Sequence, residues 1–151
     1  MPSAASNASR PHHVEAVALA IEDPKRVGHV LTVRRPPDDP DLPNAWGLPA
    51  ASIRPGESAV DAAHRAAEDK LGVTLDLGPE INRGSLRRAD TTLSMTLFAA
   101  RVRTGEPHVP QPVPDVTQYT ELQWDTPDRL RPAAQRGSLC CRLALGWSVP
   151  S

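Results

Sequence analysis

Apolar residues recur along the chain in patterns that predict strands joined by polar turns. Residues 14–21 are apolar on both alternations, which is typical of a strand that is covered on both faces. Residues 92–102 show the next clearest strand pattern, with apolar side chains at alternate positions. The remaining candidate strands are residues 28–34, 73–77, 81–88 and 119–124, together with a short extended piece at 46–53.

Residues 59–71 have the period of an amphipathic helix instead. Ser58 and Asp61 form a capping-box pattern at its start, and Gly72 follows where a helix commonly ends in a left-handed cap. On a helical wheel, Lys70 is the only charged residue inside the apolar arc. A buried ammonium is unfavourable unless it is paired, so Lys70 either extends to solvent at the helix end or has a functional role. The arc consists of Ala59, Val60, Ala63, Ala66, Ala67 and Leu71.

The rest of the pattern predicts loops and one further helix. Residues 36–44 and 104–117 are rich in proline and form irregular connections. Residues 138–147 predict a closing helix that buries its apolar side. We therefore expect an α/β fold with a mixed β-sheet between helices, as a single domain over residues 12–151 that follows a disordered lead at 1–11.

The composition of the chain limits the kinds of partner that we expect for this domain. The net charge of −1 over 151 residues gives no field that would attract a nucleic acid polymer. We find neither a signal peptide nor an apolar run that could span a membrane. The adjacent Cys140 and Cys141 fit small core residues in a reducing compartment, so we expect a cytoplasmic protein. Fifteen of the 17 basic residues are arginine, which is consistent with phosphate binding and equally with a GC-rich genome.

The segment 51–73, with the residues before it, resembles the Nudix box. The family signature is G-x5-E-x7-R-E-U-x-E-E-x-G-U, where U is a bulky aliphatic residue, and a Trp-x-x-Pro-Gly run usually precedes it. The chain aligns with this signature without a gap. The matching residues are Trp46, Pro49, Gly56, Glu57, Arg65, Gly72 and Val73. The resemblance implies a Nudix-like α/β/α sandwich over most of the chain.

The positions at which the chain departs from the signature include those that bind the divalent metal in the family. Ala51 replaces the first glycine, while Ala66, Asp69 and Lys70 stand where the family has three glutamates that hold Mg²⁺ or Mn²⁺ against a substrate pyrophosphate. Asp69 and Glu57 are therefore the remaining candidate metal ligands. Two unit charges about 4 Å apart interact by about 4 kcal/mol at an effective dielectric near 20, and a dication feels about twice that. We expect a weakened or absent metal cluster, with Lys70 in the vacated cation position as a contact for an anion.

Other residues are candidates for the substrate site. Arg34, Arg35 and Trp46 lie where family members often contact phosphate or base, and Arg54 could grip an anion beside the box. Each of these residues can also be explained without a substrate, the arginines as ordinary surface residues and Trp46 as a core residue. Three acids, Glu121, Asp115 and Asp125, border the late loop, but no spacing singles out one of them as catalytic.

Within the box, Glu57, Asp69 and Lys70 are the candidate catalytic residues, and Glu57 alternatively supports the loop through backbone N–H groups. Arg65 and Gly72 are expected to brace the box. We expect a divergent hydrolase of a nucleoside-diphosphate-linked or other small phosphorylated compound. The alternatives are a non-catalytic domain that binds a nucleotide-like ligand or a protein partner, and an enzyme of different chemistry. A homodimer is a further expectation from the resemblance.

Overall fold

The structure is a computed structural model that describes residues 12–110 and 119–147. Its strands are β1 (His12–Ile21), β2 (Val30–Arg34), β3 (Trp46–Gly47), β4 (Ala50–Ser52), β5 (Thr74–Arg88), β6 (Thr91–Thr104) and β7 (Glu121–Asp125). Its helices are α2 (Ala59–Leu71), the 3-10 helix η1 (Pro127–Leu130), α3 (Arg131–Gln135) and α4 (Leu139–Ala144). None of these helices is both long and apolar enough to cross a membrane.

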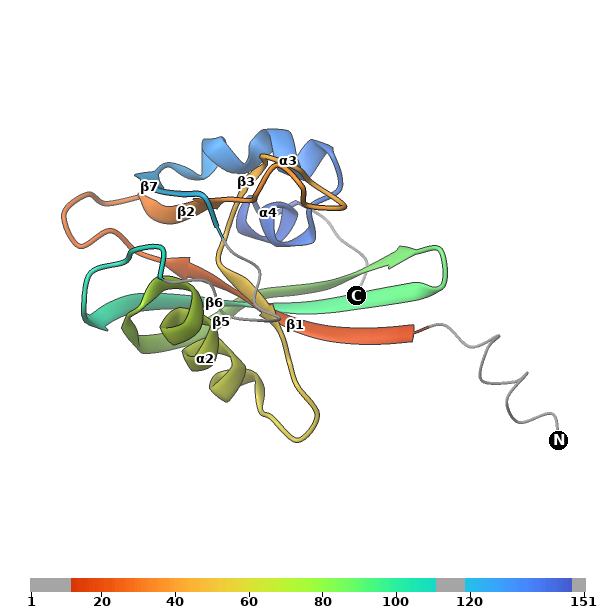
Figure 1. Cartoon of the computed structure of the whole chain (residues 1–151), viewed down its shortest axis with the longest axis horizontal. Helices are drawn as coiled ribbons and strands as arrows, with labels where there is room; N and C mark the ends of the chain where they lie inside the picture. The colour runs from red at the N-terminus through yellow and green to blue at the C-terminus, as the bar shows by residue number, and fades with distance from the viewer. Residues whose placement is uncertain (1–11, 111–118, 148–151) are drawn as a thin grey trace, which may run out of the picture.

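The described strands form two sheets (Figure 1). The larger sheet has the order β4-β1-β6-β5 and is mixed, because β1 runs parallel to β6 while its other pairs are antiparallel. The smaller sheet has the order β3-β2-β7 and is antiparallel. The expected α/β fold with a mixed sheet is confirmed, but the strands divide between two sheets where one was expected.

Helices cover the two faces of the larger sheet. Figure 1 shows α2 on one side, and α3, α4 and the smaller sheet on the other. The first core joins Val17 and Leu19 of β1 to the alanine face of α2. The second joins Ala18 of β1 and Leu97 of β6 to α4. Both faces of β1 are therefore buried, as its apolar pattern predicts.

Local signals fix α2 at both of its ends. The Ser58 hydroxyl accepts a hydrogen bond from the backbone N–H of Asp61 at 3.0 Å, and Gly72 ends the helix with φ of 68°. Small alanine side chains let the helix lie close to the sheet, and alanine has the highest helix propensity. The predicted burial of Val60 is wrong, because this side chain is 47% exposed and Ala62 is buried in its place. Ala62, Ala66 and Lys70 are spaced four residues apart, so they form one row along the face that meets the sheet.

Other boundaries differ from the expectation in informative ways. The two strands predicted at 73–77 and 81–88 are one strand, β5, and shifts in its register with β6 near Glu80 absorb the interruption at Gly78-Pro79. The closing helix α4 ends at Ala144, and Trp147 packs beside it outside the helix. The disordered lead predicted at residues 1–11 lies outside the described residues, as does the late loop beyond residue 110.

Candidate functional site

The loop that enters α2 is fixed by Glu57. Its carboxylate accepts two hydrogen bonds from the Arg65 guanidinium, both at 2.8 Å, and one from the backbone N–H of Arg54 at 3.0 Å. Arg65 also donates to the carbonyl oxygen of Ser52 in β4 at 2.8 Å. The hydrogen bonds from Arg65 lower the pKa of Glu57 to about 2, with a further contribution from the Arg54 N–H. Glu57 is therefore an ionised brace between loop and helix, and a weak proton acceptor.

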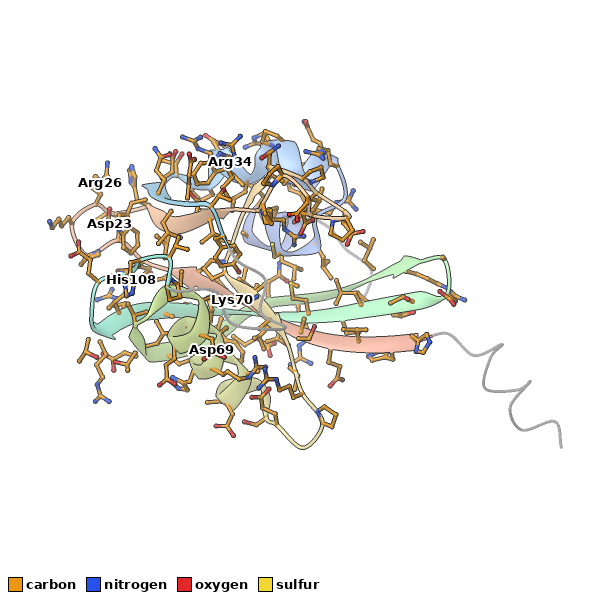
Figure 2. All side chains as sticks on the ribbon, in the orientation of Figure 1. Asp23, Arg26, Arg34, Asp69, Lys70 and His108 are labelled. Carbon is orange, nitrogen blue, oxygen red and sulfur yellow. The ribbon has the colours of Figure 1, made fainter. Side chains whose placement is uncertain are left out.

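Lys70 extends from the other end of α2 toward the strands (Figure 2). Its ammonium donates to the carbonyl oxygen of Ala50 at 2.5 Å and lies 5.5 Å from the centre of the Tyr119 ring. The Tyr119 hydroxyl accepts the backbone N–H of the same Ala50 at 3.1 Å. One side of β4 is thus held by Lys70 and Tyr119 together. This lysine does not extend to bulk solvent, which was the plain interpretation of the sequence.

Burial and charge both act on the Lys70 amine. Desolvation is the larger cause and the neighbouring cations Arg35 and Arg65 the next, and together they lower the pKa of Lys70 to about 8. Asp69 opposes this shift, although it is the smallest of the causes. The protein therefore places this amine where the charged form is disfavoured, and no carboxylate of the described residues is in hydrogen-bonding contact with it.

Lys70 lines a cleft of about 330 Å³ between α2, β4 and the β1–β6 pair. Among the described residues, the cleft is lined by one acid, Asp39, and by four basic side chains: Arg35, Arg54, Arg65 and Lys70. Asp39 is taken up by Arg35, with their side chains 3.1 Å apart, and Arg65 by Glu57. Among the described residues, Lys70 and Arg54 form no ion pair within 4 Å, although Asp69 acts on Lys70 and Glu57 on Arg54 at longer range. The cleft is therefore an electropositive site that favours an anion.

Arg34, the last residue of β2, and Arg35, which follows it, contact different parts of the molecule. Arg35 lies in the cleft, whereas Arg34 donates to the carbonyl oxygen of Asn44 at 3.1 Å and pairs with Glu121 at 3.5 Å. Trp46 lies between Arg34 and Arg129, whose guanidinium carbons are 6.0 and 5.0 Å from the ring centre. Of the four predicted substrate contacts, Arg35 and Arg54 meet in the cleft, and Arg34 and Trp46 do not line it.

The residues of the box do not fit a divalent metal. Ala66 is completely buried and offers no oxygen ligand, and Asp69 does not line the cleft. Glu57 is occupied by Arg65 and the Arg54 N–H, and the Lys70 ammonium stands at the helix position of the third glutamate. In the part of the chain that the structure describes, no three His, Cys, Asp or Glu residues gather closely enough to hold a metal ion.

The sequence reasoning missed two residues of the cleft. Tyr119 is buried at its floor, 69 positions from its hydrogen-bond partner Ala50, and Asp39 comes from the loop before β3. A signal existed for Tyr119, because a single tyrosine at the start of a predicted strand needs a partner for its hydroxyl when buried. The late acids Glu121 and Asp125 pair with arginines outside the cleft, and Asp115 lies outside the described residues.

Comparison with known proteins identifies the fold over most of the chain. The family model described as NUDIX domain matches residues 11–139. A MutT protein from Methanosarcina mazei Go1 is similar at 19% identity and a TM-score of 0.67, with 85% of this chain and 90% of that chain covered. A MutT NUDIX hydrolase from Burkholderia pseudomallei is similar at 23% identity and a TM-score of 0.65, with 84% of this chain and 99% of that chain covered. A NUDIX hydrolase from Nitrosomonas europaea is similar at 18% identity and a TM-score of 0.65, with 93% of each chain covered. No curated protein matches the chain.

Proposed function

The chain belongs to the Nudix family, and from this premise we propose that it binds a small phosphorylated, nucleotide-like compound through protein cations instead of a divalent ion. The observation that carries the proposal is the position of the Lys70 ammonium, which lies inside the cleft against Ala50. Nudix enzymes generally use Mg²⁺ or Mn²⁺. Here a fixed positive charge stands on the helix face that faces the cleft, so the charge of a bound phosphate is balanced by the protein itself.

The chemistry of the lining supports a phosphate in particular. Arginine presents a planar fork of donors that matches two phosphate oxygens, and a lysine supplies a compact charge beside it. Arg54 and Lys70 provide this combination, and Arg35 lies next to Lys70 at the inner end. The apolar side chains Leu93 and Met95 line another part of the same cleft. A compound with a phosphate and a less polar group fits both parts.

A second candidate function is hydrolysis of the same compound, in keeping with the divergent hydrolase expected from the box. The observation that favours it is the intact Glu57–Arg65 pair, since this pair holds the loop of the signature in place in a chain that has lost other signature residues. No carboxylate of the described cleft is unpaired and ready to accept a proton from water, because Asp39 is bound to Arg35. Binding is therefore the function that the geometry supports better.

Thermal stabilisation and isothermal titration with pyrophosphate, ADP and a nucleoside diphosphate sugar test the proposal. We expect at least one ligand to bind equally well with Mg²⁺ and with excess EDTA, and to bind at least tenfold more weakly to Lys70→Met. Lys25→Met removes an exposed ammonium and is the matched control. Binding that requires Mg²⁺ and survives Lys70→Met would contradict the proposal.

Hydrolysis is measured on the same ligands as phosphate release. Turnover that is lost in Asp69→Ala would support the second candidate, and absence of turnover alongside tight binding supports a non-catalytic domain. We place the protein in the cytoplasm, with no membrane or nucleic acid polymer as partner. The two buried free thiols, Cys140 and Cys141, support a reducing compartment. The homodimer stays a prediction.

A further inference from the structure

The carboxylate of Asp39 is fixed by the loop between β2 and β3 that carries it. Its Oδ2 atom accepts hydrogen bonds from the backbone N–H groups of Leu42 at 2.8 Å and Asp41 at 3.3 Å, and from Nη1 of Arg35 at 3.1 Å. Three donors leave this oxygen no further lone-pair site. The side chain is only 8% exposed. The position and the direction of the carboxylate are therefore set by the protein before any ligand arrives.

The second oxygen of the same carboxylate has different surroundings. All three of these hydrogen bonds end on Oδ2, and no N–H or O–H group of the described residues donates to Oδ1. Asp39 lines the cleft, and because its Oδ2 is enclosed by donors, Oδ1 is the oxygen that a molecule in the cleft can reach. A buried carboxylate oxygen without a donor is unfavourable. The hydrogen bond that Oδ1 lacks within the protein is therefore left to the occupant of the cleft.

Asp39 stays ionised at neutral pH. Burial raises its pKa, but the hydrogen bond from Leu42 and the charge of Arg35 outweigh this effect and hold the pKa below its ordinary value. The group is thus a strong hydrogen-bond acceptor and a weak base. Its negative charge also repels phosphate oxygens, which are drawn to Arg54 and Lys70. The cleft therefore asks for two things in one compound: an anion, and a donor elsewhere in the molecule.

We propose that Asp39 is a specificity-determining residue of the cleft, whose Oδ1 accepts one hydrogen bond from an O–H or N–H group on the part of the ligand that is not phosphate. The phosphate in this proposal rests on the proposed function, whereas the need for a donor rests on the geometry of Asp39 alone. The ligand class narrows to nucleotide-like compounds in which a sugar hydroxyl or an amino group of the base reaches this oxygen.

The selection against other compounds comes from what Oδ1 loses. A ligand that fills the cleft without a donor would shield this oxygen and leave it without a hydrogen bond, which is costly for a charged group. A site that is built to accept a hydrogen bond therefore rejects an analogue lacking the donor much more strongly than an apolar pocket would. We expect the loss of the donor to weaken binding at least tenfold.

Isothermal titration of the full-length chain with ADP and three analogues tests the proposal. Each analogue lacks one donor: 2′-deoxy-ADP and 3′-deoxy-ADP lack a hydroxyl group, and purine riboside 5′-diphosphate lacks the amino group of the base. We expect one of them to bind at least tenfold more weakly than ADP, and this analogue identifies the donor as part of the sugar or of the base. The other two should bind like ADP.

The variant Asp39→Asn shows whether Asp39 is the acceptor. The three donors around Oδ2 favour the amide oxygen there, so the amide nitrogen takes the place of Oδ1 and cannot accept a hydrogen bond. The ratio of the ADP affinity to that of the weak analogue should fall from at least ten to near one. A merely structural role would weaken both ligands equally and leave this ratio unchanged. Asp38→Asn removes an exposed carboxylate from the same loop and should preserve the ratio.

These measurements separate the inference from the proposed function. Equal binding of ADP and all three analogues, or a ratio that Asp39→Asn does not change, would overturn the inference even if Lys70→Met still weakened binding. Binding of pyrophosphate but of none of the four nucleotides would do the same. A donor preference that is lost in Asp39→Asn, in binding that requires Mg²⁺ and survives Lys70→Met, would support the inference and contradict the proposed function.

Discussion

The two ends of α2 have diverged to different degrees from the family signature. At the first end, Glu57 and Arg65 stand as the signature has them, and they join loop, helix and β4 through five hydrogen-bonding groups: both carboxylate oxygens, the guanidinium, the Arg54 N–H and the Ser52 carbonyl. At the second end, Ala66 and Lys70 replace glutamates, and Lys70 bonds a backbone carbonyl. The same helix therefore keeps its positioning contacts and has lost its ion-holding groups.

This difference shows that the positioning of the loop and helix is physically separable from the charge of the cleft. The Glu57–Arg65 contacts join the loop and the helix beside the cleft, and they involve protein groups alone. Lys70, which faces the cleft from the last turn, sets the charge of the cleft in addition to bonding the Ala50 carbonyl. A change at the second end can therefore alter the charge of the cleft while the fold persists.

Glycines at the two ends offer the strongest test. Gly56 and Gly72 both have left-handed φ, 78° and 68°, but a Cβ at Gly56 meets no atom within 4 Å, whereas one at Gly72 lies 2.3 Å from the His108 ring. Gly72→Ala should cost about 3 kcal/mol of unfolding free energy, from backbone strain and the displaced ring. Gly56→Ala should cost about 1 kcal/mol, from strain alone. Urea unfolding measures both. Equal losses would show that His108 does not pack on the helix end.

Lys70 gives the next largest effect, and it depends on pH. Below about pH 8 the folded and unfolded states are both protonated, so the full cost of the buried ammonium is present. As the pH rises from about 8 to 10.5, the folded state releases its proton first, and stability increases. Lys70→Met should therefore stabilise the protein by about 2 kcal/mol at pH 7, after allowance for partial exposure of the amine, and by little near pH 10.5. Urea unfolding as a function of pH measures this. A constant difference across this range would contradict the burial of the charge.

Restoring one acid at the second end should restore some metal binding. Lys70→Glu places a carboxylate in the cleft instead of an ammonium and should increase Mn²⁺ affinity at least tenfold, or about 1.4 kcal/mol, by isothermal titration. The variant Ala66→Glu is less suitable, because Ala66 is completely buried and its replacement would bury a carboxylate in the core. Lys25→Glu makes the same change of charge in an exposed turn and should leave affinity unchanged. Similar gains in the two variants would indicate a charge effect without a site.

Glu57 gives the smallest effect, confined to acid. Its pKa lies at about 2 in the folded protein, below its ordinary value of 4.5, so its ionised form stabilises the fold above pH 4.5 and this contribution is lost as the pH falls toward 2. Glu57→Gln should flatten the decline of the melting temperature over this window. Glu68→Gln, which removes an exposed carboxylate from the same helix, is the control. Parallel acid profiles for wild type and Glu57→Gln would show that the pair does not stabilise the fold.

The sequence predicts the local features of this molecule well. The cap at Ser58 and the left-handed Gly72 are determined by neighbours within a few residues, and both are observed as expected. The anomaly of Lys70 in an apolar arc is also visible before the structure, because helical spacing alone places it on the row of Ala62 and Ala66. What the spacing cannot give is the contact of that amine with Ala50, which depends on the packing of β4.

Features that depend on distant pairing could not be predicted. The division into two sheets arises because β2 pairs with β7, about 90 positions later, and alternation specifies a strand's buried side without naming its partner. The single strand β5 was predicted as two because Gly78-Pro79 reads as a turn, whereas pairing with β6 continues on both sides of it. The role of Tyr119 in the cleft likewise depends on a partner 69 residues away.

The opposite directions of Arg34 and Arg35 have a consequence for how this protein tolerates change. Arg34 pairs in register with Glu121, and the backbone N–H of Arg35 donates to Ala45. An insertion or deletion of one residue in β2 would exchange the two side chains, so that the arginine bound to Asp39 would face Glu121 instead. The charge that lines the cleft is thereby tied to the length of one short strand, and natural or engineered length changes should accumulate in the preceding turn at residues 22–29 and not in β2.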